Sequence, residues 1–518
     1  MKVIHFSIIT IFVIFFESHA AFANNALVPV ISLLLNESPL GINKCQANLL
    51  ADLNGPQSTG HAVAARFTNF GNLTLFFADH EDTGKEPWVT DGTPAGTHIL
   101  KDIQLGPEDS IETSSPDREI VRVGDKVYFL ADDGVHGEEL WVTDGTNNGT
   151  KMVDDIESGT GSSWLRNLTS FNGKLYFLMA RPNPDGNGVN GLWVSEGTAE
   201  TTQLVSYGPP NIGTWSGEKA DSMVVLNNRL IFAARSEDAG FELWQSDGNS
   251  SGTSLLKDIY PGTSHSNPRQ LTVVADKVFF MANDGSHGTE LWVTNGTSNG
   301  TLMVKDIYPG SERGVMAISI DAQRKKNPGF NDKLYFAGRT PSQGTELWVT
   351  DGTPAGTNIV RDIAPGSDSS DLVTPHDCLR AGEVFNNKFY FSADVYSEAG
   401  DKIHDRALWR VNEDGSTTVQ YSCCPPPQSN HSNGEVEFLT ANNDFLFFRG
   451  TGVLNGSYRR QELFIMDNHG QTRLIDIYPG NVTSDPGYLH IRNDQSLLFV
   501  TDGNLAPGVG LYLLECQQ

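Results

Sequence analysis

Residues 346–366 read ELWVTDGTPAGTNIVRDIAPG, and this stretch decides the fold of the chain. Apolar residues around Trp348 and at Ile359–Val360 predict two short strands, because β-branched and aromatic residues favour a half-buried strand pair. Between them, Asp351-Gly352-Thr353 predicts a tight turn, since Asp hydrogen-bonds to its own backbone and Gly adopts positive φ without a Cβ clash. Pro365-Gly366 ends the second strand. We therefore expect a β-hairpin with an exit turn.

The same hairpin recurs along the whole chain. Copies of the motif begin at Glu86, Glu139, Gly191, Glu242, Glu290 and Glu346, and weaker copies begin at Ala407, Glu462 and Gly510. Their aromatic anchors lie 48 to 61 residues apart, at Trp88, Trp141, Trp193, Trp244, Trp292, Trp348, Trp409, Phe464 and Tyr512. A regular period of about 50 residues is typical of a repeat architecture, so the fold must be assigned from the repeat.

Each repeat carries four strand signals, which are clearest in the fifth copy. They lie at Gln270–Ala275, Val278–Ala282, Glu290–Thr294 and Thr301–Ile307, with short turns between them. Four antiparallel strands repeated around a ring predict an all-β, single-ring β-propeller. A β-solenoid or a row of small sandwiches is disfavoured, because solenoid coils are usually shorter and a lone four-stranded sheet cannot bury both faces.

The two ends of the chain complement each other. Only three strand signals remain at the C-terminal end, at Leu489–Arg492, Leu497–Thr501 and Leu511–Glu515, while Asn48–Leu53 resembles the missing fourth strand. We expect the N-terminal strand to complete the last blade, because this closure removes an open sheet edge. The closure predicts nine four-stranded blades. Eight blades with an irregular end is the alternative, since propellers usually have four to eight.

The five cysteines predict disulfides, because the chain carries the features of an exported protein. Cys45 and Cys516 fall on neighbouring strands of the closing blade, so we predict a disulfide between them. This bond would close a very long loop, where chain entropy gives a stabilisation of about 4–5 kcal/mol. Cys378 is predicted to pair with Cys423 or Cys424, which leaves one thiol over, and a strained disulfide between the adjacent Cys423 and Cys424 is the alternative.

The N-terminus and the overall charge predict where the protein is located. Residues 1–23 read as a signal peptide with an apolar run at Val3–Phe16 and a cleavage site at Ala21-Phe22-Ala23. A lead segment, 24–45, precedes the propeller at 46–515, and no later stretch has the roughly 20 apolar residues of a membrane span. We expect a secreted or cell-surface protein, or a periplasmic one in a Gram-negative source. With 36 basic and 63 acidic residues, the formal charge of −27 disfavours nucleic acid and anionic membranes.

The repeated motif, ELWVTDGTxxGT followed by DIxPG, resembles that of the ELWxxDGT-repeat family, a group of exported, mostly bacterial proteins. The resemblance covers about residues 46–515 and rests on several near-exact copies of a long motif. It implies a propeller-like architecture and export. The family has no established activity, so it supplies no catalytic residues for this chain.

The repeated acids and histidines favour structural roles. Calcium loops need carboxylates at alternating positions, and none of the Asp-Gly turns has that spacing, so we expect no cofactor, with calcium as the alternative. The Asp of the Asp-Ile exit recurs too often to be one tuned catalytic group, and we expect it to accept backbone N–H bonds between blades. His136 and His287 repeat within one loop type and follow the same reasoning. No Gly-x-Ser-x-Gly, HExxH or P-loop motif is present.

Two loops that interrupt the repeat are the candidate binding loops. They span 321–331 and 394–406 and carry basic residues on an acidic chain: Arg324, Lys325, Lys326, Lys402 and Arg406. Tolerated surface insertions are the alternative explanation. The expected function is a non-catalytic binding or cell-surface interaction module for an extracellular glycan or protein. The alternative is a secreted carbohydrate-active hydrolase or lyase with a site in the central channel.

Overall fold

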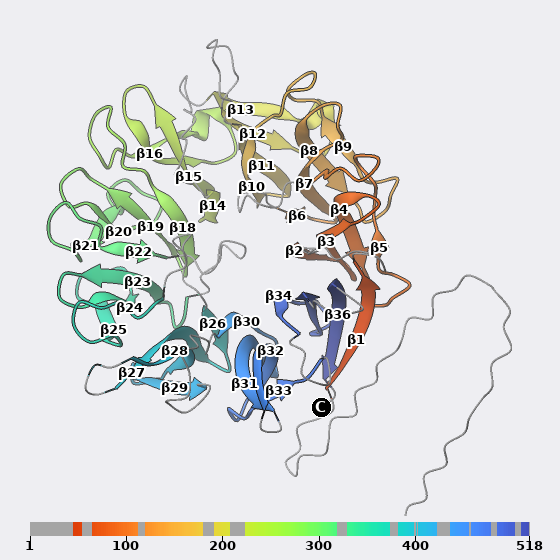
Figure 1. Cartoon of the computed structure of the whole chain (residues 1–518). Helices are drawn as coiled ribbons and strands as arrows, with labels where there is room; N and C mark the ends of the chain where they lie inside the picture. Colours follow the sequence, from red (N-terminus) through yellow and green to blue (C-terminus); the bar gives the residue numbers. More distant parts are fainter. Residues whose placement is uncertain are drawn as a thin grey trace, which may run out of the picture.

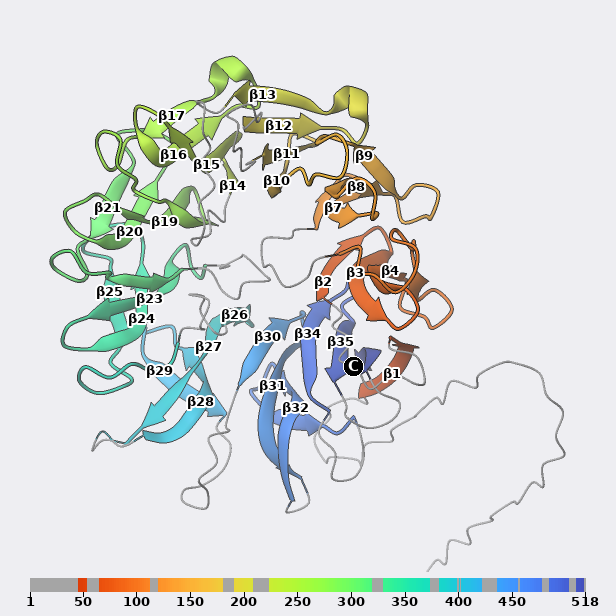
Figure 2. The same cartoon turned by 45° about the horizontal axis from the view of Figure 1, so that its top comes forward.

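The protein is an all-β ring of nine four-stranded antiparallel sheets, as a computed structural model shows (Figures 1 and 2). The structure describes residues 45–53, 65–111, 120–179, 191–207, 223–318, 329–372, 382–397, 400, 402–421, 436–454, 457–477, 484–502 and 509–516. The nine-bladed β-propeller expected from the repeat is therefore confirmed. Within the described residues, no helix is long and apolar enough to cross a membrane.

The first strand of each blade lies nearest the centre of the ring (Figure 1), and we call these the inner strands. They are β2 (Ala65–Phe70), β6 (Val121–Val123), β10 (Leu165–Phe171), β14 (Met223–Leu226), β18 (Arg269–Val274), β22 (Val315–Ala317), β26 (Gly382–Phe385), β30 (Glu437–Ala441) and β34 (Pro486–Ile491). The second strands are β3 (Leu73–His80), β7 (Lys126–Asp132), β11 (Lys174–Met179), β15 (Arg229–Ser236), β19 (Lys277–Asn283), β23 (Leu334–Thr340), β27 (Lys388–Tyr396), β31 (Phe445–Leu454) and β35 (Leu497–Asp502).

The third strands carry the Glu-Leu-Trp motif, and the fourth strands lie at the outer edge of the ring. The third strands are β4 (Gly84–Thr90), β8 (Glu138–Thr143), β12 (Gly191–Ser195), β16 (Gly240–Ser246), β20 (Thr289–Thr294), β24 (Gly344–Thr350), β28 (Lys402–Val411), β32 (Ser457–Asp467) and β36 (Val509–Cys516). The fourth strands are β5 (His98–Ile99), β9 (Lys151–Asp154), β13 (Gln203–Tyr207), β17 (Ser254–Lys257), β21 (Leu302–Lys305), β25 (Asn358–Arg361), β29 (Thr417–Tyr421), β33 (Thr472–Ile475) and β1 (Cys45–Asp52). Two short 3-10 helices, η1 (Ala199–Thr201) and η2 (Ser250–Gly252), lie in hairpins.

Hydrogen bonds within the Asp-Gly-Thr turn explain its repetition. In blade 6, Asp351 Oδ1 accepts from the N–H (2.9 Å) and the hydroxyl (2.7 Å) of Thr353. The hydroxyls of Thr350 and Thr357 lie 2.7 Å apart across the base of the turn. Gly352 has a φ of +91°, which favours glycine. The turn is therefore specified by its own side chains, as the sequence predicts.

The hydrophobic core is divided among the nine interfaces between neighbouring blades. At the interface of blades 6 and 7, for example, Tyr335 and Leu347 belong to one apolar cluster with Phe389 and Trp409. Equivalent clusters lie between all other neighbours, including the last and first blades, where Trp88 joins Leu511. Because each sheet is buried by its neighbours, each blade depends on the blades beside it for its stability.

The N-terminal strand closes the ring, as predicted. β1 pairs antiparallel with β36, and Cys45 lies opposite Cys516 in the register. The two residues form a disulfide across a sequence separation of 471, which confirms the predicted bond. Cys378, Cys423 and Cys424 lie outside the described residues, so their pairing stays a prediction. The signal peptide and lead segment at 1–44 also lie outside them.

Candidate functional site

A fully buried glutamate in the third strand holds the linker to the next blade. In blade 1, Glu86 is 0% exposed. Its carboxylate accepts hydrogen bonds from the N–H groups of Ile103 (3.0 Å) and Gln104 (3.3 Å) and from the hydroxyl of Ser110 (2.7 Å). We call this arrangement the glutamate clamp. Exit N–H groups are held in the same way by Glu139, Glu242, Glu290 and Glu346, and Glu462 accepts from the hydroxyl of Ser484.

The sequence analysis missed the glutamate clamp. Its only sequence signal is partial: 24 residues separate the glutamate from the linker serine in four blades, as between Glu242 and Ser266, but the spacing is 22 in blade 8 and blade 5 has Gly314 in place of the serine. Burial raises the pKa of Glu86, Glu242 and Glu346 to about 7 and that of Glu139 and Glu290 to about 8. Shifted carboxyl groups often mark an active site, but a catalytic group is tuned by one environment. Five copies in equivalent places therefore indicate a structural role.

The exit aspartates differ from the sequence expectation. They were expected to accept backbone N–H bonds between blades, whereas the glutamate of the clamp accepts the bonds of the exit residues. Asp155 Oδ2 accepts from Gly159 N at 3.4 Å, within its own turn. The correction has a physical reason: the glutamate side chain is longer and starts from the third strand, so it reaches the exit N–H groups from inside the blade.

The repeated histidines belong to self-contained loops. His136 Nδ1 lies 2.8 Å from Asp133 Oδ2, and His287 Nδ1 lies 2.7 Å from Asp284 Oδ2. The hydrogen bond to the aspartate raises the pKa of each histidine. Among the described residues, no group of three or more His, Cys, Asp or Glu side chains has an arrangement that could hold a metal ion.

Five inner strands share a bulge that carries a different side chain in each copy. In β10 the register shifts between Arg166 and Thr169, and Asn167 has a φ of +56°. Residues other than Gly, Asn and Asp rarely adopt this left-handed backbone conformation. The residues at the equivalent position have φ values between 53° and 62° and are Arg66, Asn167, Gln270, Phe438 and Tyr488.

Alternating charges link blades 6 to 9 beside the starts of β30 and β34. Arg406 Nη1 lies 2.6 Å from Glu437 Oε1, and its Nε lies 3.6 Å from Asp371 Oδ2. Arg449 contacts the same Glu437 and binds Asp485 Oδ1 at 2.7 Å. All five side chains are mostly buried or half-buried. We call this group the inner charge chain.

Two of the bulge residues lie beside the inner charge chain. The guanidinium of Arg449 lies 4.5 Å from the ring centre of Phe438, and that ring lies 6.4 Å from the ring of Tyr488 on the next inner strand. Both rings are partly exposed. Blades 8 and 9 therefore present aromatic faces and acidic groups together at the centre of the ring, and this is the candidate functional site.

The basic loops expected from the sequence are only partly described. Arg324, Lys325 and Lys326 lie outside the described residues. Lys402 Nζ lies 2.7 Å from Asp394 Oδ2, and Arg406 belongs to the inner charge chain. Both cations are paired with acids of this chain, and their role as ligand contacts stays a prediction.

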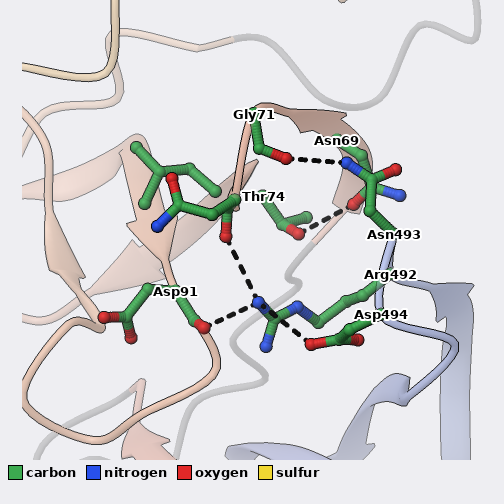
Figure 3. A pocket seen from close by; sticks show the side chains of 9 residues that line it. Asn69, Gly71, Thr74, Asp91, Arg492, Asn493 and Asp494 are labelled. Atoms are coloured by element: carbon green, nitrogen blue, oxygen red, sulfur yellow. Dashed lines mark hydrogen bonds and ion pairs between the residues drawn. The ribbon is translucent and has the colours of Figure 1, made fainter.

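A polar cavity of about 430 Å³ lies where the last blade meets the first (Figure 3). Arg492 is 7% exposed there and donates to the carbonyl oxygens of Asp91 (2.6 Å) and Asn72 (3.3 Å). In blade 2, Lys126 makes the equivalent bond to Glu196 O of the next blade. The cavity therefore surrounds a contact that joins blades, and we assign it a structural role.

The fold and the site define a nine-bladed propeller with aromatic and charged side chains on its inner strands. No family model matches the chain, and no curated protein matches it. Solved structures do match, with TM-scores below 0.4 in the cases reported below.

A puromycin hydrolase mutant is 13% identical with a TM-score of 0.36, covering 75% of this chain and 59% of its own. A prolyl endopeptidase is 10% identical with a TM-score of 0.39, and the match covers 86% of this chain and 55% of the endopeptidase. Sqt1 of Saccharomyces cerevisiae is 12% identical with a TM-score of 0.38, covering 89% of this chain and 98% of Sqt1. This chain thus spans little more than half of the two peptidases. The likeness shows the fold alone.

The expected function requires a correction. The sequence analysis expected a non-catalytic binding or cell-surface interaction module, with a carbohydrate-active enzyme as the alternative. Several of the similar solved structures are instead peptidases or their propeller domains, including a prolyl endopeptidase and the propeller domain of a Pyrococcus furiosus protease. The propeller fold therefore does not indicate either of the two expected functions, and neither expected function is retained. No residue of these peptidases is transferred to this chain.

Proposed function

We propose that this chain is the peptide-selecting propeller of a peptide-processing system and that it admits extended, cationic polypeptide at the centre of the ring. The observation that carries the proposal is the shared bulge with its varying side chain. Export and membership of the ELWxxDGT-repeat family remain parts of the proposal, and both imply that the peptide is extracellular.

The residue type at the bulge position varies from blade to blade, whereas the framework residues of the repeat are constant. The Trp anchor, the clamp glutamate and the Asp-Gly turn recur because each blade needs the same contacts. Glycine would adopt the left-handed bulge backbone without strain, yet Arg66, Phe438 and Tyr488 keep large side chains there. Bulges re-aim side chains beside functional sites, and strained backbone is often retained for function. The partly exposed bulge residues Arg66, Phe438 and Tyr488 therefore favour a ligand-facing role, whereas Asn167 is buried and Gln270 accepts from Ile318 N in the next blade.

The chemistry of the centre suits an extended cationic peptide. Among the described strands, each inner strand pairs on one side only, so its other edge can bond to a peptide backbone by strand addition. Tyr488 offers an aromatic face to a Lys or Arg side chain, beside Phe438, whose ring already contacts the guanidinium of Arg449. Asp485 and the net charge of −27 add electrostatic attraction for cations.

The proposal is tested by fluorescence anisotropy with labelled, unstructured peptides of matched length, one built from Lys, Ala and Phe and the other from Glu, Ala and Phe. We expect the cationic peptide to bind and the acidic one not to bind, with affinity falling as salt rises. Asp485→Asn should weaken binding about tenfold, because it removes an acid of the candidate site. Tyr488→Ala should also weaken binding, since it removes an aromatic face.

The matched control is Asp494→Asn, which removes the same charge from the same blade at the polar cavity. It should leave the affinity unchanged. The proposal is overturned if neither peptide binds, or if Asp494→Asn and Asp485→Asn weaken binding equally. Melting temperatures of all variants show whether a lost affinity reflects a lost fold.

A further inference from the structure

Trp164 directly precedes the inner strand β10 and is not one of the repeated Trp anchors. The residue is 42% exposed, whereas anchors such as Trp141 and Trp348 are 6% exposed. Its backbone has a φ of +52°, which a bulky residue rarely adopts. Strained backbone of this kind is often retained for function, so an exposed indole at this place needs an explanation.

Other blades fill the same backbone position with smaller, polar residues. A buried serine precedes the position in four linkers, at Ser163, Ser266, Ser370 and Ser484. The N–H of the first three serines donates to the carbonyl of the residue before the clamp glutamate, at 3.0 to 3.1 Å. The residue after the serine has a positive φ in all four linkers and is Trp164, Asn267, Asp371 or Asp485. Asn and Asp tolerate this backbone, so Trp164 is the exception among the four.

This position belongs to the centre of the ring. Asp371 and Asp485 are members of the inner charge chain, where they contact Arg406 and Arg449. Trp164 occupies the equivalent place at the start of β10. In Figure 1, β10 lies on the opposite side of the centre from β30 and β34. A ligand that crosses the centre from the candidate functional site therefore extends toward the blade that carries Trp164.

The chemistry at Trp164 favours an uncharged ring as its partner. An exposed indole offers a flat apolar face, and aromatic pairs stack offset or edge to face with a gain beyond their buried area. Arg166, two residues further along the chain, adds positive charge here and disfavours a Lys or Arg side chain. Asp485 and Tyr488 favour cations on the other side of the centre. The two sides therefore suit different side chains of one peptide.

We propose that Trp164 forms a second binding subsite at the centre of the ring, which selects an aromatic side chain of the peptide whose cationic side chains bind beside Asp485 and Tyr488. The inference rests on the proposed function and adds a sequence preference to it. A selected peptide carries cationic and aromatic residues together, and the strained backbone of Trp164 is kept because it places the indole at this subsite.

Two labelled, unstructured peptides of equal length and charge test the subsite by fluorescence anisotropy. One is built from Lys, Ala and Phe, and the other from Lys and Ala alone. The natural chain should bind the Phe-containing peptide about tenfold more tightly. Trp164→Asn supplies the residue type that blade 5 has in this backbone, at Asn267, and should bind both peptides equally. A Trp kept only for packing would leave the preference unchanged when it is replaced.

Two control variants separate the subsite from the cationic side of the centre. Trp164→Phe retains an aromatic ring and should keep most of the preference for the Phe-containing peptide. Tyr488→Ala should weaken the binding of both peptides by the same factor, so the preference should remain. Melting temperatures show that each variant is folded. If Trp164→Asn does not fold, Trp164→Gly replaces it, because glycine adopts the same backbone without strain.

The possible failures of the two proposals are distinguishable. The subsite alone is overturned if the natural chain binds both cationic peptides equally, or if Trp164→Asn keeps the preference. In either case the proposed function stands, because cationic peptides still bind. If neither cationic peptide binds the natural chain, the proposed function is wrong and the subsite is overturned with it.

Discussion

Glycine at the Asp-Gly-Thr turn is required by its own backbone and also by the preceding blade. Gly145 has a φ of +89°, and a Cβ there would lie 2.8 Å from Leu73 and 3.0 Å from Phe70 of blade 1. A Cβ at Gly248 would similarly lie 2.5 Å from the hydroxyl of Tyr176 in blade 3. The turn of one blade therefore rests on the inner hairpin of its neighbour. This contact explains why the motif keeps glycine even where the neighbouring Asp becomes Asn or Glu.

Gly145→Ala should destabilise the protein by about 2–4 kcal/mol, because it combines backbone strain with a clash in a packed interface. Gly159→Ala is the matched control, since its φ is +101° and nothing lies near its added Cβ. That variant should cost about 1 kcal/mol from strain alone. Urea unfolding of both variants measures the difference. Equal losses would show that the contact between blades contributes nothing.

At the scale of strands, the inner charge chain joins β28, β30 and β31 through one shared acid. Glu437→Gln leaves Arg406 and Arg449 as two neighbouring, mostly buried cations without their common partner. We expect a loss of about 1–3 kcal/mol, because two mostly buried cations lose their shared acid and keep only Asp371 and Asp485 as partners. The loss should be read from urea unfolding at low and high salt, and it should shrink as salt screens the repulsion between the two cations.

A surface ion pair is the control for this variant. Lys174 Nζ lies 2.6 Å from Glu196 Oε1, but both side chains are about half exposed. Glu196→Gln should therefore change stability much less than Glu437→Gln does. If both variants lose the same small amount, the inner charge chain has no special role in joining the blades.

The strands and turns could be predicted from the sequence because their causes are local. The expected strand at Val278–Ala282 is found at Lys277–Asn283, and the Asp-Gly-Thr turn forms from its own hydrogen bonds. The glutamate clamp could not be found this way, because its partners are 17 to 24 residues away and a charged residue inside an apolar strand reads as solvent-facing. The bulge was not predicted either, because Asn167 does not interrupt the alternation of apolar and polar residues along its strand.

At the scale of the whole molecule, the blade number and the closure follow from counting strands at the two ends. The candidate site does not follow from such counting. It needs Arg406, Glu437 and Asp485 from three blades to meet, and only the ring brings them together. The sequence drew attention to basic insertions, whereas the structure pairs Lys402 and Arg406 with acids. A contact across blades has no signal in one repeat, so the site could be identified only after closure.

The last prediction concerns closure itself. In the double variant Cys45→Ser with Cys516→Ser, β1 keeps its hydrogen bonds to β36 but loses its covalent tie. We expect the free energy of unfolding to fall by about 4–5 kcal/mol, because the unfolded chain regains the entropy of a very long open loop. The measurement is urea unfolding without reductant, compared with the natural chain.

The order in which strands lose hydrogen-exchange protection shows whether the disulfide holds only the closing blade or stabilises every blade. β1 is the only strand of the ninth blade that comes from the N-terminal end, so the open chain can release it without first unfolding blades 1 to 8. Hydrogen exchange in the variant should therefore rise first at β1 and β36, while the N–H groups of Ile307 and Tyr308 in blade 5 stay protected. A uniform rise around the ring would contradict this, because it would mean that the disulfide stabilises every blade equally and that the ring unfolds as one unit.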